Sequence, residues 1–175
     1  MPLTPATDAD LEAVAALVNA SYRGAGGWTN EADYLDGERT DAETLRRDLA
    51  AQPNATLLTL RDASDGPLLG VVWLEPAEAD TWYLGMLTVR PDIQDRQLGR
   101  ALLGEAETWA AARGARRIKM TVVNVRDTLI AWYERRGYRL TGETLPFPYE
   151  DQPFGAPKRD DLAFVVLERA IEAVN

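Results

Sequence analysis

The chain has 175 residues, enough for one domain whose hydrophobic core needs neither a metal nor disulfides. It contains no cysteine and no histidine, which excludes thiolate nucleophiles, disulfides and the commonest metal ligands, and leaves acid–base chemistry to Glu, Asp, Tyr and Lys. Its formal net charge of −9 disfavours nucleic-acid binding, and no apolar run is long enough for a membrane helix. With no signal-peptide pattern either, we expect a cytoplasmic protein without nucleic-acid or membrane partners.

The first fifty residues predict a short strand, a helix, a polar loop and a second helix. Thr7 is placed to cap the first helix, because apolar residues follow it at helical spacing. Thr40 and Glu43 have the spacing of a capping box at the start of the second helix. The loop between the two helices is polar but contains Trp28 and Tyr34.

The next segment has the pattern of strands. Residues 55–62, 68–75 and 80–89 are apolar, β-prone runs separated by turn signals, and three such runs in succession predict an antiparallel meander. Gly85 lies inside the third run. A glycine in a strand interior is typical of a bulge or of a close backbone approach.

A polar loop containing Gly99 then opens a helix that ends at Gly114, and residues 116–125 form the next predicted strand. A strand, a helix and a strand in this order favour a parallel crossover connection.

The last fifty residues predict a short helix, a strand, a long loop and a final strand. Asp127 is the expected cap of the helix, and Gly137 its end. Residues 138–145 and 162–171 are the strands, and the loop from 146 to 158 between them is rich in proline and charge. The elements together predict one mixed α/β domain.

The loop that opens the helix near Leu98 is a candidate anion site. The first N–H groups of a helix lack intrahelical partners and carry partial positive charge. Gly99 lets the backbone approach a ligand closely, and Arg96 and Arg100 would add charged donors to phosphate oxygens. A solvated loop with a good helix start is the ordinary alternative.

Two segments resemble the hallmark motifs of the GNAT superfamily of acetyl-CoA-dependent N-acetyltransferases. "MLTVRPDIQDRQLGRALLGEAE" resembles the strand, proline and Q/R-x-x-G-x-G/A loop that opens a helix, and "LIAWYERRGYRLTGE" resembles an aromatic–Tyr pair before a Gly–aromatic pair. The chain departs from the pattern twice. Gln97 replaces the first motif glycine, at a cost of about 1 kcal/mol if its φ is positive. Arg126 stands where many members have an asparagine, with Asn124 two residues earlier.

The resemblance implies an α/β fold with a single mixed, mostly antiparallel twisted sheet of six to seven strands and helices on both faces, spanning residues 1–175. It implies acetyl-CoA (coenzyme A) as cofactor, its pantetheine arm lying between two parted strands, with a bulge at Gly85 or Met86. The cofactor-binding residues that it implies are Leu87, Thr88, Val89, Gln94, Asp95, Arg96, Gln97, Leu98, Gly99, Arg100, Ala101, Asn124, Arg126 and Tyr133.

The reaction implied by the resemblance is direct attack of a small-molecule amine on the thioester. Tyr133 matches the general acid of the family, which protonates the leaving thiolate; a core tyrosine is the alternative. Glu75, at the end of a predicted strand, is the candidate base acting through water, against the alternative of a solvent-exposed charge. The expected lining of the acceptor pocket is Trp28, Tyr34 and Trp73.

Other functions fit the same pattern. A non-catalytic acyl-CoA-binding or sensor domain would use the same loop, and a protein or peptide N-acetyltransferase would use the same chemistry. The loop over 146–158 either closes over the pocket or binds a partner. Dimers are common enough that we expect a homodimer.

Overall fold

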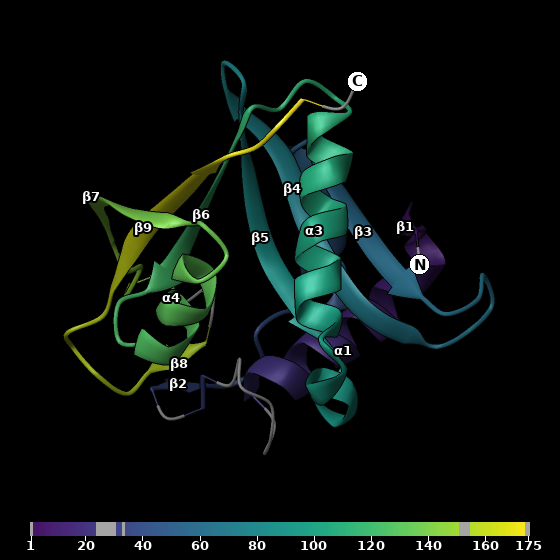
Figure 1. Cartoon of the computed structure of the whole chain (residues 1–175). Helices are drawn as coiled ribbons and strands as arrows, with labels where there is room; N and C mark the ends of the chain where they lie inside the picture. The colour runs from purple at the N-terminus through teal and green to yellow at the C-terminus, as the bar shows by residue number, and fades with distance from the viewer. Residues whose placement is uncertain (1, 24–30, 33, 151–154, 174–175) are drawn as a thin grey trace.

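The computed structural model describes residues 2–23, 31–32, 34–150 and 155–173, with only the backbone described at 36 and 94–96. Its centre is a seven-stranded twisted sheet with the strand order β1-β3-β4-β5-β6-β9-β7 (Figure 1). Every neighbouring pair is antiparallel except β5 and β6, which confirms the predicted mixed sheet. The strands are β1 (Leu3–Pro5), β3 (Thr56–Arg61), β4 (Leu68–Glu78), β5 (Thr81–Val89), β6 (Arg117–Val123), β7 (Arg139–Pro146) and β9 (Ala163–Ala170).

Helices flank this sheet, and a two-stranded ribbon lies beside it. Thr7 begins the 3-10 turn η1 as predicted, and its N–H donates to the Asp10 carboxylate (2.8 Å). No helix within the described ranges is both long and apolar enough to cross a membrane. The remaining elements are η1 (Asp8–Asp10), α1 (Leu11–Arg23), β2 (Leu35–Asp36), α2 (Ala42–Ala51), η2 (Pro91–Arg96), α3 (Leu98–Ala111), α4 (Asp127–Glu134) and β8 (Ala156–Pro157).

The core has two layers, because the central strands bury both of their faces. Alternate residues of β3 and β4 fall into different clusters: Leu58 and Val72 pack with α3, whereas Leu57 and Val71 pack with α1 and α2. Figure 1 shows α3 in front of the sheet and α1 behind it. This confirms helices on both faces, and it explains why β4 reads as an unbroken apolar run.

Two helix caps differ from the sequence prediction by one residue. Asp41, not Thr40, caps α2, and its carboxylate accepts a hydrogen bond from the Thr44 N–H (2.7 Å). Aspartate caps as well as threonine does, so spacing alone chose the wrong residue of an adjacent pair. Arg126, not Asp127, is the cap residue of α4, and Asp127 is its first helical residue, where a negative charge suits the helix dipole.

The last long strand lies inside the sheet rather than at its edge. β9 pairs with all of β6, from Arg117 to Val123, and with β7 on its other side. β7 is therefore the edge strand, and its residues are exposed. This arrangement gives β6 a full set of backbone partners on one side, so its other side is able to part from β5.

Replacement of Gly70 and of Gly104 by alanine should change the free energy of unfolding in opposite directions. A Cβ at Gly70 would lie 2.9 Å from the Thr88 carbonyl oxygen and 3.1 Å from Leu102 Cδ2. A Cβ at Gly104, an exposed residue of α3, would meet nothing within 4 Å. We expect Gly70→Ala to lower the free energy of unfolding by about 1–3 kcal/mol. Gly104→Ala should raise it by about 0.5–1 kcal/mol. Urea unfolding of both variants measures the two effects. An unchanged free energy of unfolding in Gly70→Ala would contradict the tight contact between α3 and the sheet.

Candidate active site

The site begins where β5 and β6 separate. Their parallel pairing covers only Thr81–Tyr83 against Arg117–Lys119, although both strands continue further. A cavity of about 370 Å³ opens beyond the last pair, lined by both strands and by α1, α4, β7 and β9. The backbone of β5 facing β6 therefore borders a space large enough for a small ligand.

A β-bulge re-aims β5 at this cavity. Val71 pairs with Thr88 but Trp73 pairs with Gly85, so β5 has one residue more than β4 across this step. Met86, inside the bulge, has a φ of +55°. The bulge predicted at Gly85 or Met86 is confirmed, and it lies on the cavity wall, where both residues are part of the lining.

Helix α1 holds the bulged part of β5 through two hydroxyl groups that sequence reasoning missed. Tyr22 Oη donates to the Leu87 carbonyl (3.3 Å), and Ser21 Oγ donates to the Val89 carbonyl (3.1 Å). Thr88 is buried and donates to the Met86 carbonyl (3.0 Å). These contacts fix the strand backbone beside the cavity, while its pairing with an extended ligand stays a prediction.

The amino end of α3 has the geometry of an anion site. Gln97 adopts the left-handed conformation (φ 57°, ψ 22°), and its carbonyl accepts from the Ala101 N–H (3.1 Å). Helix geometry leaves the N–H groups of Leu98, Gly99 and Arg100 without intrahelical acceptors. The strained residue is therefore the one that turns these groups outward. The side chains of Gln94, Asp95 and Arg96, for which we predicted ligand contacts, lie outside the described residues.

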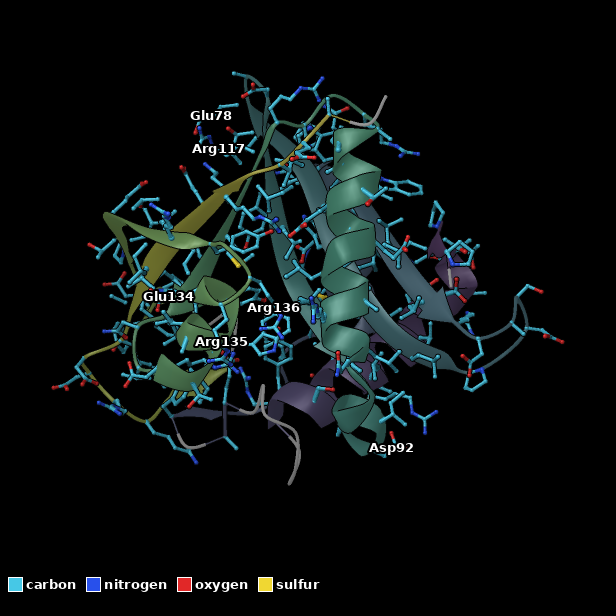
Figure 2. The ribbon with its side chains drawn as sticks, in the orientation of Figure 1. Glu78, Asp92, Arg117, Glu134, Arg135 and Arg136 are labelled. Carbon is cyan, nitrogen blue, oxygen red and sulfur yellow. The ribbon has the colours of Figure 1, made fainter. Side chains whose placement is uncertain are left out.

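Charged side chains gather beside this helix end. Arg100 of α3 lines a groove with Arg135 and Arg136, which follow α4, and with the ion pair of Arg169 and Glu107. Figure 2 shows Arg135 and Arg136 on the side of α4 that faces α3. Arg136 stacks on the Trp132 ring, with its guanidinium carbon 3.8 Å from the ring centroid. Burial, followed by repulsion from Arg135 and Arg100, lowers the pKa of Arg136. Such a group of like charges favours a polyanionic ligand, and the sequence pattern did not identify Arg135 or Arg136 as part of it.

Tyr133 lies in the cavity wall. Its ring makes edge contacts with Trp132 (5.1 Å between centroids) and Tyr138 (5.7 Å), which hold its orientation. Its hydroxyl makes no hydrogen bond within the described part of the chain. Burial, and then the nearby Tyr22, raises the pKa of the Tyr133 phenol above its ordinary value. The phenol is therefore protonated at neutral pH and has a proton to give.

Glu75 and Trp73 lie on the α1 and α2 side of the sheet. They line a smaller groove of about 260 Å³ that shares Tyr83, Gly85 and Met86 with the main cavity. Glu75 is half-buried and sits opposite Tyr83 in the register of β4 and β5. The carboxylate thus lies at the mouth of the site on the face away from α3, and its role as base stays a prediction.

Two other predicted site residues, Tyr34 and Asn124, have different surroundings. Tyr34 is buried in a separate apolar cluster with Phe147, and Trp28 lies outside the described residues. The Asn124 amide donates to the Asp161 carbonyl (3.0 Å) and accepts from the Ala163 N–H (3.1 Å), so it ties the end of β6 to the start of β9. Their contacts with acceptor or cofactor stay predictions.

The long loop after β7, predicted either to close over the pocket or to bind a partner, contributes to the cavity lining at its start. Phe147 and Pro146 are part of the cavity lining. Further along, β8 pairs with β2, and the Lys158 N–H donates to the Tyr34 carbonyl (2.8 Å). The loop is thereby attached to the segment between α1 and α2.

These features correspond to one known family. A model described as the acetyltransferase (GNAT) family matches residues 27–138. The chain belongs to this family. The parted strands, the bulge and the helix that opens with Gln97 all lie within the GNAT match.

Individual relatives resemble this chain either in the sequence of part of their length or in their fold. Mycothiol acetyltransferase from Beutenbergia cavernae is 37% identical over 82 residues, which are 47% of this chain and 28% of that protein, so the chain spans well under half of that relative. The PaiA N-acetyltransferase from Thermoplasma acidophilum, solved in complex with coenzyme A, has a TM-score of 0.69 at 17% identity over 97% of this chain and 98% of its own. Ribosomal-protein-alanine N-acetyltransferase from Brucella melitensis has a TM-score of 0.68 at 21% identity, covering 98% and 100%. The two structures share the GNAT fold.

Gln97 supplies a direct test of the strain at the amino end of α3. Replacing it by glycine removes the steric cost of a positive φ, so we expect Gln97→Gly to raise the free energy of unfolding by about 1 kcal/mol. Gln97→Ala keeps the cost and serves as the control. Calorimetry with coenzyme A should give equal affinity for Gln97→Gly and the wild type. Weaker binding of coenzyme A by Gln97→Gly would mean that the Gln97 side chain contacts the ligand.

Proposed function

We propose that this GNAT protein transfers an acetyl group from acetyl-CoA to the amine of a small molecule. The observation that carries the proposal is the cavity between the parted β5 and β6, with a bulge on its wall. An extended thioester fits such a gap by pairing with strand backbone, as a peptide does when it adds to a sheet edge.

The residues present suit coenzyme A. The backbone N–H groups between Gln94 and Ala101 would hold the diphosphate at the amino end of α3. Arg100, Arg135 and Arg136 line the adjoining groove and would add charge-assisted bonds to phosphate oxygens. Leu87 and its neighbours in β5 would pair with the pantetheine arm. Coenzyme A bound to the similarly folded PaiA protein supports the same assignment.

Bound acetyl-CoA supplies the thioester whose acetyl group the amine takes. Tyr133 then has the role of acid, because its protonated hydroxyl faces the cavity without another hydrogen-bond partner in the described residues. It donates its proton to the leaving sulfur. The burial that raises its pKa keeps that proton on the phenol across the physiological range.

Glu75 is the proposed base. Its carboxylate lies in the smaller groove beside Tyr83 and Met86, which the main cavity shares. A water between the carboxylate and the amine would carry the proton away. The proposed acid and base belong to different elements, Tyr133 to α4 and Glu75 to β4, so the proton given to the sulfur and the proton taken from the amine would use separate groups.

The cavity favours a small acceptor over a protein. Its volume of about 370 Å³ is at the lower end of small-molecule sites, and Phe147 of the late loop closes one side. The curated relatives are named mycothiol acetyltransferases, which supports a small-molecule class without identifying the compound.

Release of free coenzyme A tests the proposal. Because the chain has no cysteine, a thiol reagent added to protein, acetyl-CoA and a panel of amines reports only the released cofactor. Turnover with at least one small amine is expected. Tight binding of coenzyme A without turnover on any amine would instead favour an acyl-CoA sensor, and turnover only with peptides a peptide N-acetyltransferase.

Replacement of the proposed acid should reduce rate without reducing affinity. We expect Tyr133→Phe to lower kcat by about 10²-fold or more, with an unchanged Kd for coenzyme A. Since burial raises the pKa of Tyr133, the wild-type rate should show no loss of an essential acid below about pH 10. Tyr138→Phe is the control, because that hydroxyl binds Glu107 away from the cavity. An unchanged kcat in Tyr133→Phe would remove the acid assignment.

A matched pair of variants tests the proposed base. Glu75→Gln preserves shape but cannot accept a proton, so kcat/KM should fall by about 10²-fold at neutral pH. Glu78→Gln, three residues along the same strand and paired with Lys119 on the surface, should have wild-type activity. Equal activity of the two variants would leave Glu75 as a strand-end charge.

A further inference from the structure

Arg126 is a buried cation whose hydrogen-bonding capacity is not used. The residue is 9% exposed and lines the main cavity. Its Nη1 lies 3.6 Å from Glu31 Oε2, beyond hydrogen-bond distance, and its Nη2 is buried without a partner. No side chain or carbonyl within the described ranges accepts a hydrogen bond from this guanidinium.

Glu31 is shared between two buried arginines. Its Oε1 accepts a hydrogen bond from Arg23 Nη1 at 2.6 Å. Its Oε2 makes only the longer ion pair with Arg126 Nη1 at 3.6 Å. Arg126 therefore keeps its charge partner but has an Nη2 without a hydrogen-bond acceptor among the residues that the structure describes.

A buried guanidinium with unmade hydrogen bonds is costly in free energy, and the cost is recovered when a ligand supplies the acceptors. The planar fork of arginine matches a carboxylate through two parallel hydrogen bonds. We propose that Arg126 binds a carboxylate of the acceptor, so that the substrate is an amine that also carries a carboxylate, as an amino acid does. This inference rests on the proposed acetyl transfer.

The position of Arg126 relative to Tyr133 fits such a molecule. Arg126 caps α4 and Tyr133 follows seven residues later, so both lie on one face of the helix, about 10 Å apart along its axis. Both line the same cavity, together with Leu129 between them. With its amine near the Tyr133 hydroxyl, a small molecule would reach Arg126 with its carboxylate.

The rest of the lining separates this subsite from the phosphate site. None of the residues at the amino end of α3, from Gln97 to Ala101, is part of the cavity that holds Arg126. Its neighbours in that lining are the charged Glu31 and Arg39 and the aromatic Tyr22, Phe147 and Phe164. A carboxylate bound to Arg126 would have these aromatic rings on one side, which favours amino acids with apolar or aromatic side chains.

Matched acceptors test the assignment. The panel consists of free apolar and aromatic amino acids, and of the same compounds as carboxamides, so that each pair differs only in the negative charge. For wild-type protein we expect kcat/KM to favour the acid over its amide by roughly 10²- to 10³-fold. Arg126→Gln should abolish that preference while leaving the Kd of coenzyme A unchanged, and Arg126→Lys should restore part of it. Arg113→Gln, where the arginine stacks on Trp109 at the far end of α3, is the control.

The outcomes separate this inference from the proposed function. Turnover with equal rates for acids and amides would overturn the carboxylate subsite but not acetyl transfer, and a weakened affinity for coenzyme A in Arg126→Gln would assign Arg126 to the cofactor. If no amine turns over, the coenzyme A-loaded protein is titrated with N-acetyl amino acids. Heat in the wild type that is lost in Arg126→Gln supports the subsite, and no heat with any carboxylate overturns it. If Arg126→Gln does not fold, Arg126→Lys, which keeps a cation beside Glu31, carries the comparison.

Discussion

The site depends on a gap in the sheet, where the backbones of β5 and β6 make no hydrogen bonds with each other. Beyond Tyr83 and Lys119 the two strands part, and unpaired backbone would be costly without other partners. β6 obtains its partners from β9 along its whole length, and the carbonyls of Leu87 and Val89 in β5 obtain theirs from hydroxyl groups of α1. Each wall of the gap is thus bound to another element, β6 to β9 and β5 to α1.

Two of the residues with a strained backbone belong to the features described above. Among the described non-glycine residues, φ is positive at Met86 in the bulge, at Gln97 before α3 and at Ala79 in the turn between β4 and β5. Met86 and Gln97 are the two that concern the site. Each costs about 1–2 kcal/mol, which the packed layers on both faces of the sheet can sustain. The first residue directs β5 into the cavity, and the second turns the N–H groups of α3 outward. Strain of this kind is expected where geometry serves binding rather than stability.

Charge is distributed unevenly around the same gap. The chain has a net charge of −9, yet arginines lie at both ends of the site: Arg100, Arg135 and Arg136 beside α3, and Arg126 within the cavity. The first group suits phosphates on the outside of the fold. The second, buried beside Glu31, suits a single carboxylate on the acceptor. If both proposals hold, anion recognition divides into a cofactor part and a substrate part.

The sequence by itself determined the kinds and order of the longer elements, because periodicity, glycines and the motif around Gln97 are local properties of the chain. It did not predict η2 or the short ribbon of β2 and β8. It located the bulge to within a residue, whereas the role of Tyr133 as acid stays a prediction. It misplaced two helix caps, since Thr40 and Asp41 are chemically equivalent at that position. Only the tertiary structure decided that β9 enters between β6 and β7, that Ser21 and Tyr22 hold β5, and that Arg126 lines the cavity with an Nη2 that has no hydrogen-bond partner in the described part of the chain. Those contacts join residues far apart in the chain, and their free energy depends on burial, which no local pattern specifies.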